Sequence, residues 1–102
     1  MDVICVDGNF APEVMAFFNE HGVVVPTQDS MYTIREVVNV ATKGTKALLL
    51  EEIINPKVPQ DHPVLGKVMY EPNWAINRFR TLAGDNINSR ELERELAQKL
   101  VK

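Results

Sequence analysis

Turn-forming residues interrupt this sequence so often that its apolar stretches are only a few residues long. Residues 23–25 and 47–50 are examples, whereas roughly 20 apolar residues are needed to cross a bilayer. Six prolines and five glycines are spread over 102 residues, so the elements between them must be short. A chain of this length fits one domain with a thin core. We therefore expect brief β-segments with peripheral helices.

The segments between the turns have the residue pattern of β-strands. Alternation or clustering of β-branched residues predicts strands over residues 3–6, 31–40, 47–54, 64–70 and 74–82. The alternation shifts at Glu36, which predicts a β-bulge, and a hairpin turn is expected at residues 42–45. Three prolines predict a loop over residues 55–63. The expected core consists of Ile34, Leu48, Leu50 and Phe79.

A first helix is predicted over residues 12–21. Pro12 suits the first helical turn, and Glu13 beside it is favoured by the helix dipole. One face is formed at the i, i+3, i+4, i+7 spacing by Val14, Phe17, Phe18 and His21. Gly22 can adopt the left-handed conformation that ends a helix. This helix is an insertion between the first two predicted strands.

The C-terminal residues 85–102 carry the clearest amphipathic helix. Asn88 or Ser89 can cap it, and Asn88 and Glu91 have the spacing of a capping box. The apolar stripe consists of Leu92, Leu96 and Leu100. A helix of about 14 residues is marginal alone in water, so we expect this stripe to pack on the body of the domain or on a partner. The elements together predict an α+β fold around a small, strongly bent antiparallel sheet.

Three ordered stretches carry a resemblance to a known group of proteins. They are residues 4–7, residues 32–36 with 48–53, and residues 78–82. In this order they resemble short uncharacterised proteins encoded by phages and mobile elements of bacteria. The resemblance implies a small Src-homology-3-like β-barrel over residues 1–84, followed by the helix of residues 85–102. It implies no activity and no catalytic residue.

Charge and cysteine content narrow the function classes. Eleven basic and 14 acidic residues give a net charge of −3, which disfavours a domain built to neutralise phosphates. Cys5 is the single cysteine, so no internal disulfide forms and a reducing cytoplasm is the simplest location. The first residues lack the basic start and long apolar stretch of a signal peptide. We expect no membrane association.

Catalytic, cofactor and metal sites are not predicted. Cys5 lies among apolar residues and aspartates, which disfavour the thiolate, and it is interpreted as a buried strand residue. His21 is interpreted as a helix-terminal residue, and His62 lies in the predicted loop. One cysteine and two histidines without a close pair are a poor zinc set. An enzyme using a carboxylate with either histidine stays the least favoured alternative.

The favoured function is a non-enzymatic protein-interaction module. Trp74 follows Pro72 and Asn73, so it is predicted to be exposed in a loop, where it would bind a partner together with the leucine stripe. A homodimer through the C-terminal helix is one form of this hypothesis. The alternative is a weak nucleic-acid-binding accessory protein, or an anion patch, built from Arg78 and Arg80 with help from Arg35 and Lys67. Glu52 is expected to pair with one of the first two arginines across the sheet.

Overall fold

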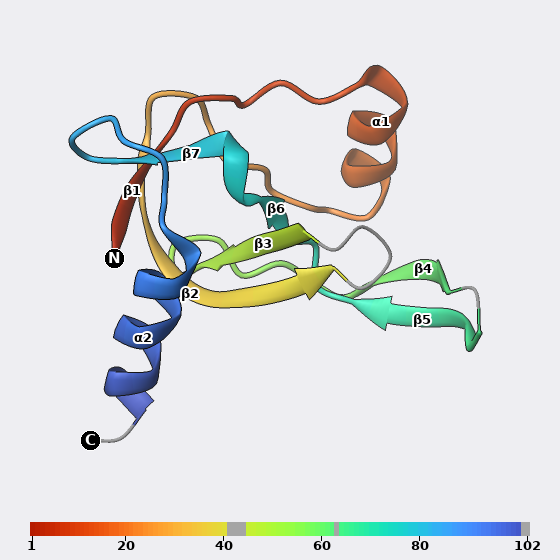
Figure 1. Cartoon of the computed structure of the whole chain (residues 1–102). Helices are drawn as coiled ribbons and strands as arrows, with labels where there is room; N and C mark the ends of the chain where they lie inside the picture. Colours follow the sequence, from red (N-terminus) through yellow and green to blue (C-terminus); the bar gives the residue numbers. More distant parts are fainter. Residues whose placement is uncertain (41–44, 63, 101–102) are drawn as a thin grey trace.

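The computed structural model describes residues 1–40, 45–62 and 64–100, and these form an α+β fold (Figure 1). A five-stranded antiparallel sheet is accompanied by a separate two-stranded ribbon and two helices. The elements are β1 (Asp2–Cys5), α1 (Pro12–Glu20), β2 (Met31–Val40), β3 (Thr45–Leu50), β4 (Val58–His62), β5 (Gly66–Tyr70), β6 (Trp74–Ala75), η1 (Ile76–Arg78), β7 (Phe79–Thr81) and α2 (Ser89–Leu100).

The long strand β2 organises the five-stranded sheet, whose order is β6-β3-β2-β1-β7. Its first residues pair with β1 and its later residues with β3. The register shifts between Ile34 and Glu36, so the predicted β-bulge is confirmed. A bulge bends and twists its strand, which turns β2 from one half of the sheet into the other. The hairpin turn predicted at residues 42–45 lies mostly outside the described residues.

The predicted strand over residues 74–82 is wrong in its middle. The 3-10 turn η1 separates β6, which pairs with β3 at one edge, from β7, which pairs with β1 at the other. A 3-10 turn advances only about 2 Å per residue, so the two edges of the sheet must curl towards each other. Among the described residues no pairing joins β6 to β7, and the sheet stays open at this seam.

The predicted loop over residues 55–63 contains a strand. β4 pairs with β5 in a regular antiparallel register from Val58 opposite Tyr70 to His62 opposite Gly66. The prolines predicted a loop because proline is excluded from central strands. Proline is tolerated in an edge strand, and Pro59 lies in such a strand. Figure 1 shows the ribbon extending away from the five-stranded sheet.

The strand that returns after the hairpin is shorter than predicted. β3 ends at Leu50, and a bend follows at Glu51 and Glu52 instead of strand residues. The two carboxylate oxygens of Glu52 accept the Thr33 N–H at 2.8 and 3.0 Å. The expected pairing of Glu52 with Arg78 or Arg80 is therefore wrong.

Buried Asn55 ties the segment after β3 to the segment after α1. Its carboxamide accepts the Val24 N–H and donates to the Val24 carbonyl, both at 2.8 Å. The Asn55 N–H donates to Glu71 Oε2, and the same oxygen pairs with Arg35 at 2.6 Å. Because buried amides and charges are costly unless they are paired, this network fixes where the chain leaves the core to form the ribbon.

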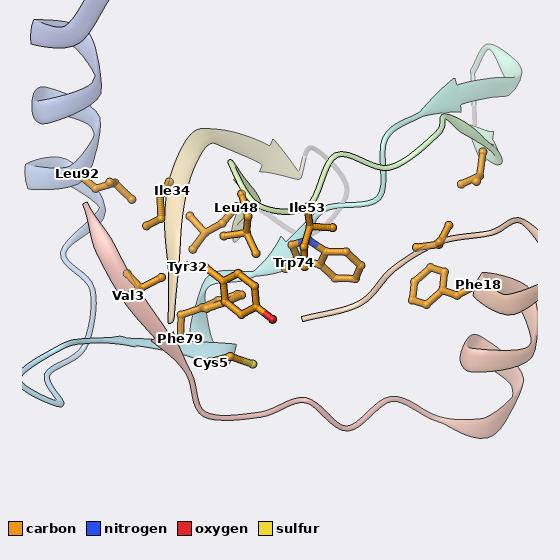
Figure 2. Packing of buried hydrophobic residues seen from close by; sticks show 13 residues of the cluster. Val3, Cys5, Phe18, Tyr32, Ile34, Leu48, Ile53, Trp74, Phe79 and Leu92 are labelled. Atoms are coloured by element: carbon orange, nitrogen blue, oxygen red, sulfur yellow. The ribbon is translucent and has the colours of Figure 1, made fainter. Parts of the chain in front are cut away.

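The expected core residues are confirmed. Ile34, Leu48, Leu50 and Phe79 are fully buried, and Figure 2 shows Ile34, Leu48 and Phe79 grouped with Tyr32 inside the bent sheet. Tyr32 contributes its ring edge to Phe79, while its hydroxyl accepts the Thr27 N–H at 2.8 Å. One partly polar aromatic residue thereby fills the core and satisfies a loop donor.

Trp74 belongs to this core, so the prediction of an exposed loop residue is wrong. It begins β6 and is 2% exposed. Its ring meets the rings of Phe10 and Phe18 edge-on, with centroids 5.8 and 5.9 Å away. Figure 2 shows the indole directed from the sheet towards α1. The inserted helix, which the sequence placed at residues 12–21, is held to the sheet by this aromatic contact.

Helix α2 docks on its own sheet through its first turns. Asn88 Oδ1 accepts the Glu91 N–H at 3.1 Å, as the capping prediction requires. Leu92 is 0% exposed and lies beside Val3 and Ile34 (Figure 2), and Leu96 is half-buried against the same cluster. The side chain of Leu100 lies outside the described part of the structure.

Candidate functional site

The Cys5 thiol is fully buried in β1. Burial raises its pKa above the ordinary value of 9.0, and the negative charges of Asp7 and Asp29 raise it further, whereas a hydrogen bond with the Asp7 backbone and the charge of Arg78 act in the opposite direction. A nucleophilic cysteine needs the opposite setting, accessible and with a lowered pKa. The sequence interpretation of a buried strand cysteine is confirmed.

We expect a water-soluble thiol reagent to modify the native protein only as fast as the chain unfolds. The reason is that the Cys5 side chain is fully buried in the folded sheet, and only the thiolate reacts. Reaction with an aromatic disulfide followed by absorbance, with and without denaturant, measures this directly. Rapid stoichiometric labelling of the native protein contradicts the burial of Cys5.

The two histidines belong to different elements of the fold. His21 ends α1, where its Nδ1 lies 2.9 Å from the Phe17 carbonyl and its ring packs on the Phe17 ring. His62 ends β4, and its side chain lies outside the described part. Within the described residues, no three histidine, cysteine or acidic side chains gather in a way that would hold a metal ion.

Arg78 is held by the loop that follows β1. Its Nη1 donates to the carbonyls of Asn9 at 2.7 Å and Asp7 at 3.2 Å, and it lies 3.5 Å from the Asp7 carboxylate. The guanidinium carbon also sits 4.0 Å above the Phe10 ring. Such a cation stacked on an aromatic ring and bonded to carbonyls holds the loop in place, and it offers little to a phosphate.

The other predicted cations do not join Arg78. Arg35 donates from Nε to the Leu50 carbonyl at 3.1 Å and pairs with Glu71. Lys67 lies on the ribbon, opposite Asp61 in the β4–β5 register. These three cations therefore lie in separate settings, and Arg35 and Arg78 are bonded to acidic and carbonyl partners there.

Arg80 is different, because among the described residues it has no carboxylate partner. Its Nη1 donates to the carbonyls of Asn77 and Phe79, at 3.0 and 2.8 Å. The side chain lines an open depression of about 250 Å³ on the η1–β7 side of the sheet. The other residues that line it are Ile76, Asn77, Phe79, Asn86 and Ile87.

The ribbon carries a second notable surface. Val64 is 83% exposed, Leu65 71% and Met69 61%, and we call these three residues the ribbon surface. The rest of the ribbon is anchored at its base by Val58, which is fully buried. All three residues belong to the segment that extends away from the five-stranded sheet (Figure 1).

Sequence reasoning missed both surfaces for identifiable reasons. The ribbon surface lies beside β4, a strand whose prolines had predicted a loop. The depression is lined by residues of η1 and β7 together with residues 86–87. The apolar alternation had predicted a continuous strand in place of the 3-10 turn η1. Arg80 itself was predicted as part of an anion patch, but the patch was expected to include Arg78 as well.

Comparisons with protein-family models, with curated proteins and with solved structures found no match to this chain. The resemblance to phage and mobile-element proteins therefore stays a prediction. In the described part of the chain, neither helix has the length and apolar character that a bilayer crossing requires.

Proposed function

We propose that this chain is a non-enzymatic protein-interaction module whose partner is a second copy of itself. The strongly bent five-stranded sheet, with η1 carrying the chain from one edge to the other, supports a small Src-homology-3-like barrel as its body. We do not assign the partner contact to the leucine stripe, because Leu92 is buried inside the domain. The observation that carries the proposal is the exposed, projecting ribbon.

A two-stranded ribbon is incomplete by itself. Isolated hairpins are at best marginally stable in water, and three or more strands are needed for independent stability. Val58 and Tyr70 pair at the base of the ribbon and pack at the core, and the ribbon extends from there away from the five-stranded sheet (Figure 1). A second ribbon added alongside would complete a four-stranded sheet.

The outer edge of β5 is the one suited to this addition. Pro59 removes a backbone donor from β4 and blunts its outer edge. The strand β5 contains no proline and no register shift, so its alternate N–H and C=O groups remain open to another strand. In the described residues β5 pairs with β4 alone.

The sequence of β5 distinguishes two registers of a two-fold pair, one centred on Lys67 and one centred on Val68. A pair centred on Lys67 would place two lysines directly opposite each other, which is destabilising. A pair centred on Val68 places Lys67 opposite Met69 of the second copy. The second register brings the lysine stem against an apolar side chain and keeps the like charges apart, so we assign the contact to it.

This register makes a charge-dependent prediction at Met69. In the dimer, Met69→Lys creates two like-charge pairs, each between the new lysine of one copy and Lys67 of the other, whereas Met69→Glu creates two opposite-charge pairs. Each pair contributes up to about 1 kcal/mol, so the dissociation constants of the two variants are expected to differ by about tenfold or more. Sedimentation velocity over a concentration series measures both.

Leu82→Asp serves as a control, because Leu82 is an exposed apolar residue outside the ribbon. This variant should dimerise like the wild type, whereas Leu65→Asp should not. A wild-type chain that sediments as a monomer at every concentration refutes the proposal. Equal dissociation constants for Met69→Lys and Met69→Glu would place any dimer contact somewhere else.

A further inference from the structure

The depression beside η1 has the chemistry of a small binding site, and it is separate from the ribbon. Phe79 is fully buried beneath it, and Ile76 and Ile87 are half-buried hydrophobic residues packed against the core. Asn77 and Asn86 are exposed at its border. An apolar floor with a few polar groups around it is the usual composition of a ligand site.

The Arg80 guanidinium is fixed in place from one side only. The two carbonyls that it contacts both accept from Nη1. Its Nε and Nη2 groups form the opposite edge, which carries a fork of parallel N–H donors. That fork matches the two oxygens of a carboxylate, and a fixed guanidinium loses less freedom on binding than a mobile one.

The positive charge of Arg80 is not balanced by a carboxylate of the described residues. Arg35 is paired with Glu71 and Arg78 with Asp7, whereas the described part of the chain supplies no carboxylate to Arg80. The side-chain carboxamides of Asn77 and Asn86 also make no hydrogen bond to the described residues, and they provide further donors at the border. The Arg80 guanidinium and the two carboxamides therefore present N–H donors at the depression without an acceptor from the described residues.

We infer that this depression binds a carboxylate attached to a small aliphatic group, with Arg80 holding the carboxylate and the two isoleucines contacting the aliphatic part. The volume of about 250 Å³ lies below that of sites for drug-sized ligands, which begin near 300 Å³. It fits a short branched acid or the terminal residue of an extended peptide. Both ligands share the recognised group, and the experiment separates them.

The test uses the intact ¹⁵N-labelled chain in an NMR titration. N-acetyl-valine should produce saturable shifts at the amides of Asn77, Arg80 and Ile87. N-acetyl-valine methylamide, which lacks the charge, should bind at least about tenfold more weakly, because a charge-assisted bidentate pair is lost. Isovalerate and the peptide Gly-Gly-Val then show whether the free acid or the peptide terminus binds more tightly.

Substitutions separate the guanidinium from general charge. Arg80→Gln should abolish the saturable shifts, and Arg80→Lys should weaken binding because a lysine cannot form the fork. Arg90→Gln, which removes an exposed arginine of α2, should leave binding unchanged. The comparison of acid with methylamide on the wild-type chain stays decisive even if an Arg80 variant does not fold.

Two results overturn the inference. One is equal binding of the acid and its methylamide, which would show that the carboxylate is not recognised. The other is equal binding of inorganic phosphate, which would show a general anion site without a role for the isoleucines. Neither result depends on whether the chain dimerises through β5.

Discussion

Trp74→Ala is expected to lower the free energy of unfolding by about 3–5 kcal/mol, the usual cost of removing a buried large aromatic side chain. A domain of this size has a total stability of about 5–15 kcal/mol, so the variant should be close to unfolding. The effect is large because Trp74 connects β6 to Phe10 and Phe18. Its loss leaves a cavity and also detaches α1 from the sheet.

Urea denaturation followed by circular dichroism measures this change, since the variant removes the chain's single tryptophan as a fluorophore. Trp74→Phe is the matched control, because it keeps an aromatic ring and should lose clearly less stability. A change below about 1 kcal/mol for Trp74→Ala would resemble that of an exposed residue. Such a result would contradict the position of the indole between sheet and helix.

Leu92→Ala is expected to cost about 2–5 kcal/mol, as for other buried leucines. Leu92 fixes the first turns of α2 against Val3 and Ile34, and the helix is too short to persist without docking. Its loss should release α2, which amide hydrogen exchange of residues 89–98 would detect as faster exchange.

Leu96→Ala provides the comparison within the same stripe. Leu96 is half-buried, so its truncation removes less buried surface and should cost clearly less than that of Leu92. If the two variants lose equal stability, α2 is docked along its whole stripe rather than by its first turns. If neither loses stability, the helix does not stabilise the domain.

Local signals predicted the elements that depend on neighbouring residues. The capping pair of Asn88 and Glu91 placed the start of α2, and the shifted alternation at Glu36 placed the bulge of β2. Both features follow from backbone chemistry within a few residues, so a single sequence contains them. The buried side chains of Ile34 and Phe79 were likewise recognisable from their strand positions.

Elements that depend on distant contacts were not predictable in this way. β4 forms despite Pro59 because β5 supplies a pairing partner and the proline lies at an edge. Trp74 is buried because α1, from the other end of the chain, covers it. The polar network of Asn55, Glu71 and Arg35 joins three segments, and no spacing in the sequence reveals it.

The two candidate surfaces also depend on contacts between residues that are distant in the sequence. Arg78 and Arg80 were predicted to act together, but Arg78 is bonded to the loop after β1, whereas Arg80 lines the depression beside η1. The ribbon surface was not predicted, because the strand expected over residues 64–70 had no predicted partner in the segment of residues 55–63, which was interpreted as a loop. Tertiary pairing therefore decides which of the chain's apolar and charged residues are available to a partner.

The central claim, pairing through β5, is tested most directly by amide hydrogen exchange as a function of protein concentration. In a β5–β5 pair, alternate N–H groups of residues 66–70 that point away from β4 become hydrogen-bonded. Their exchange should slow as the concentration rises through the dissociation constant, while the amides of β2 stay unchanged. Exchange of the β5 amides that is fast at every concentration would contradict the account.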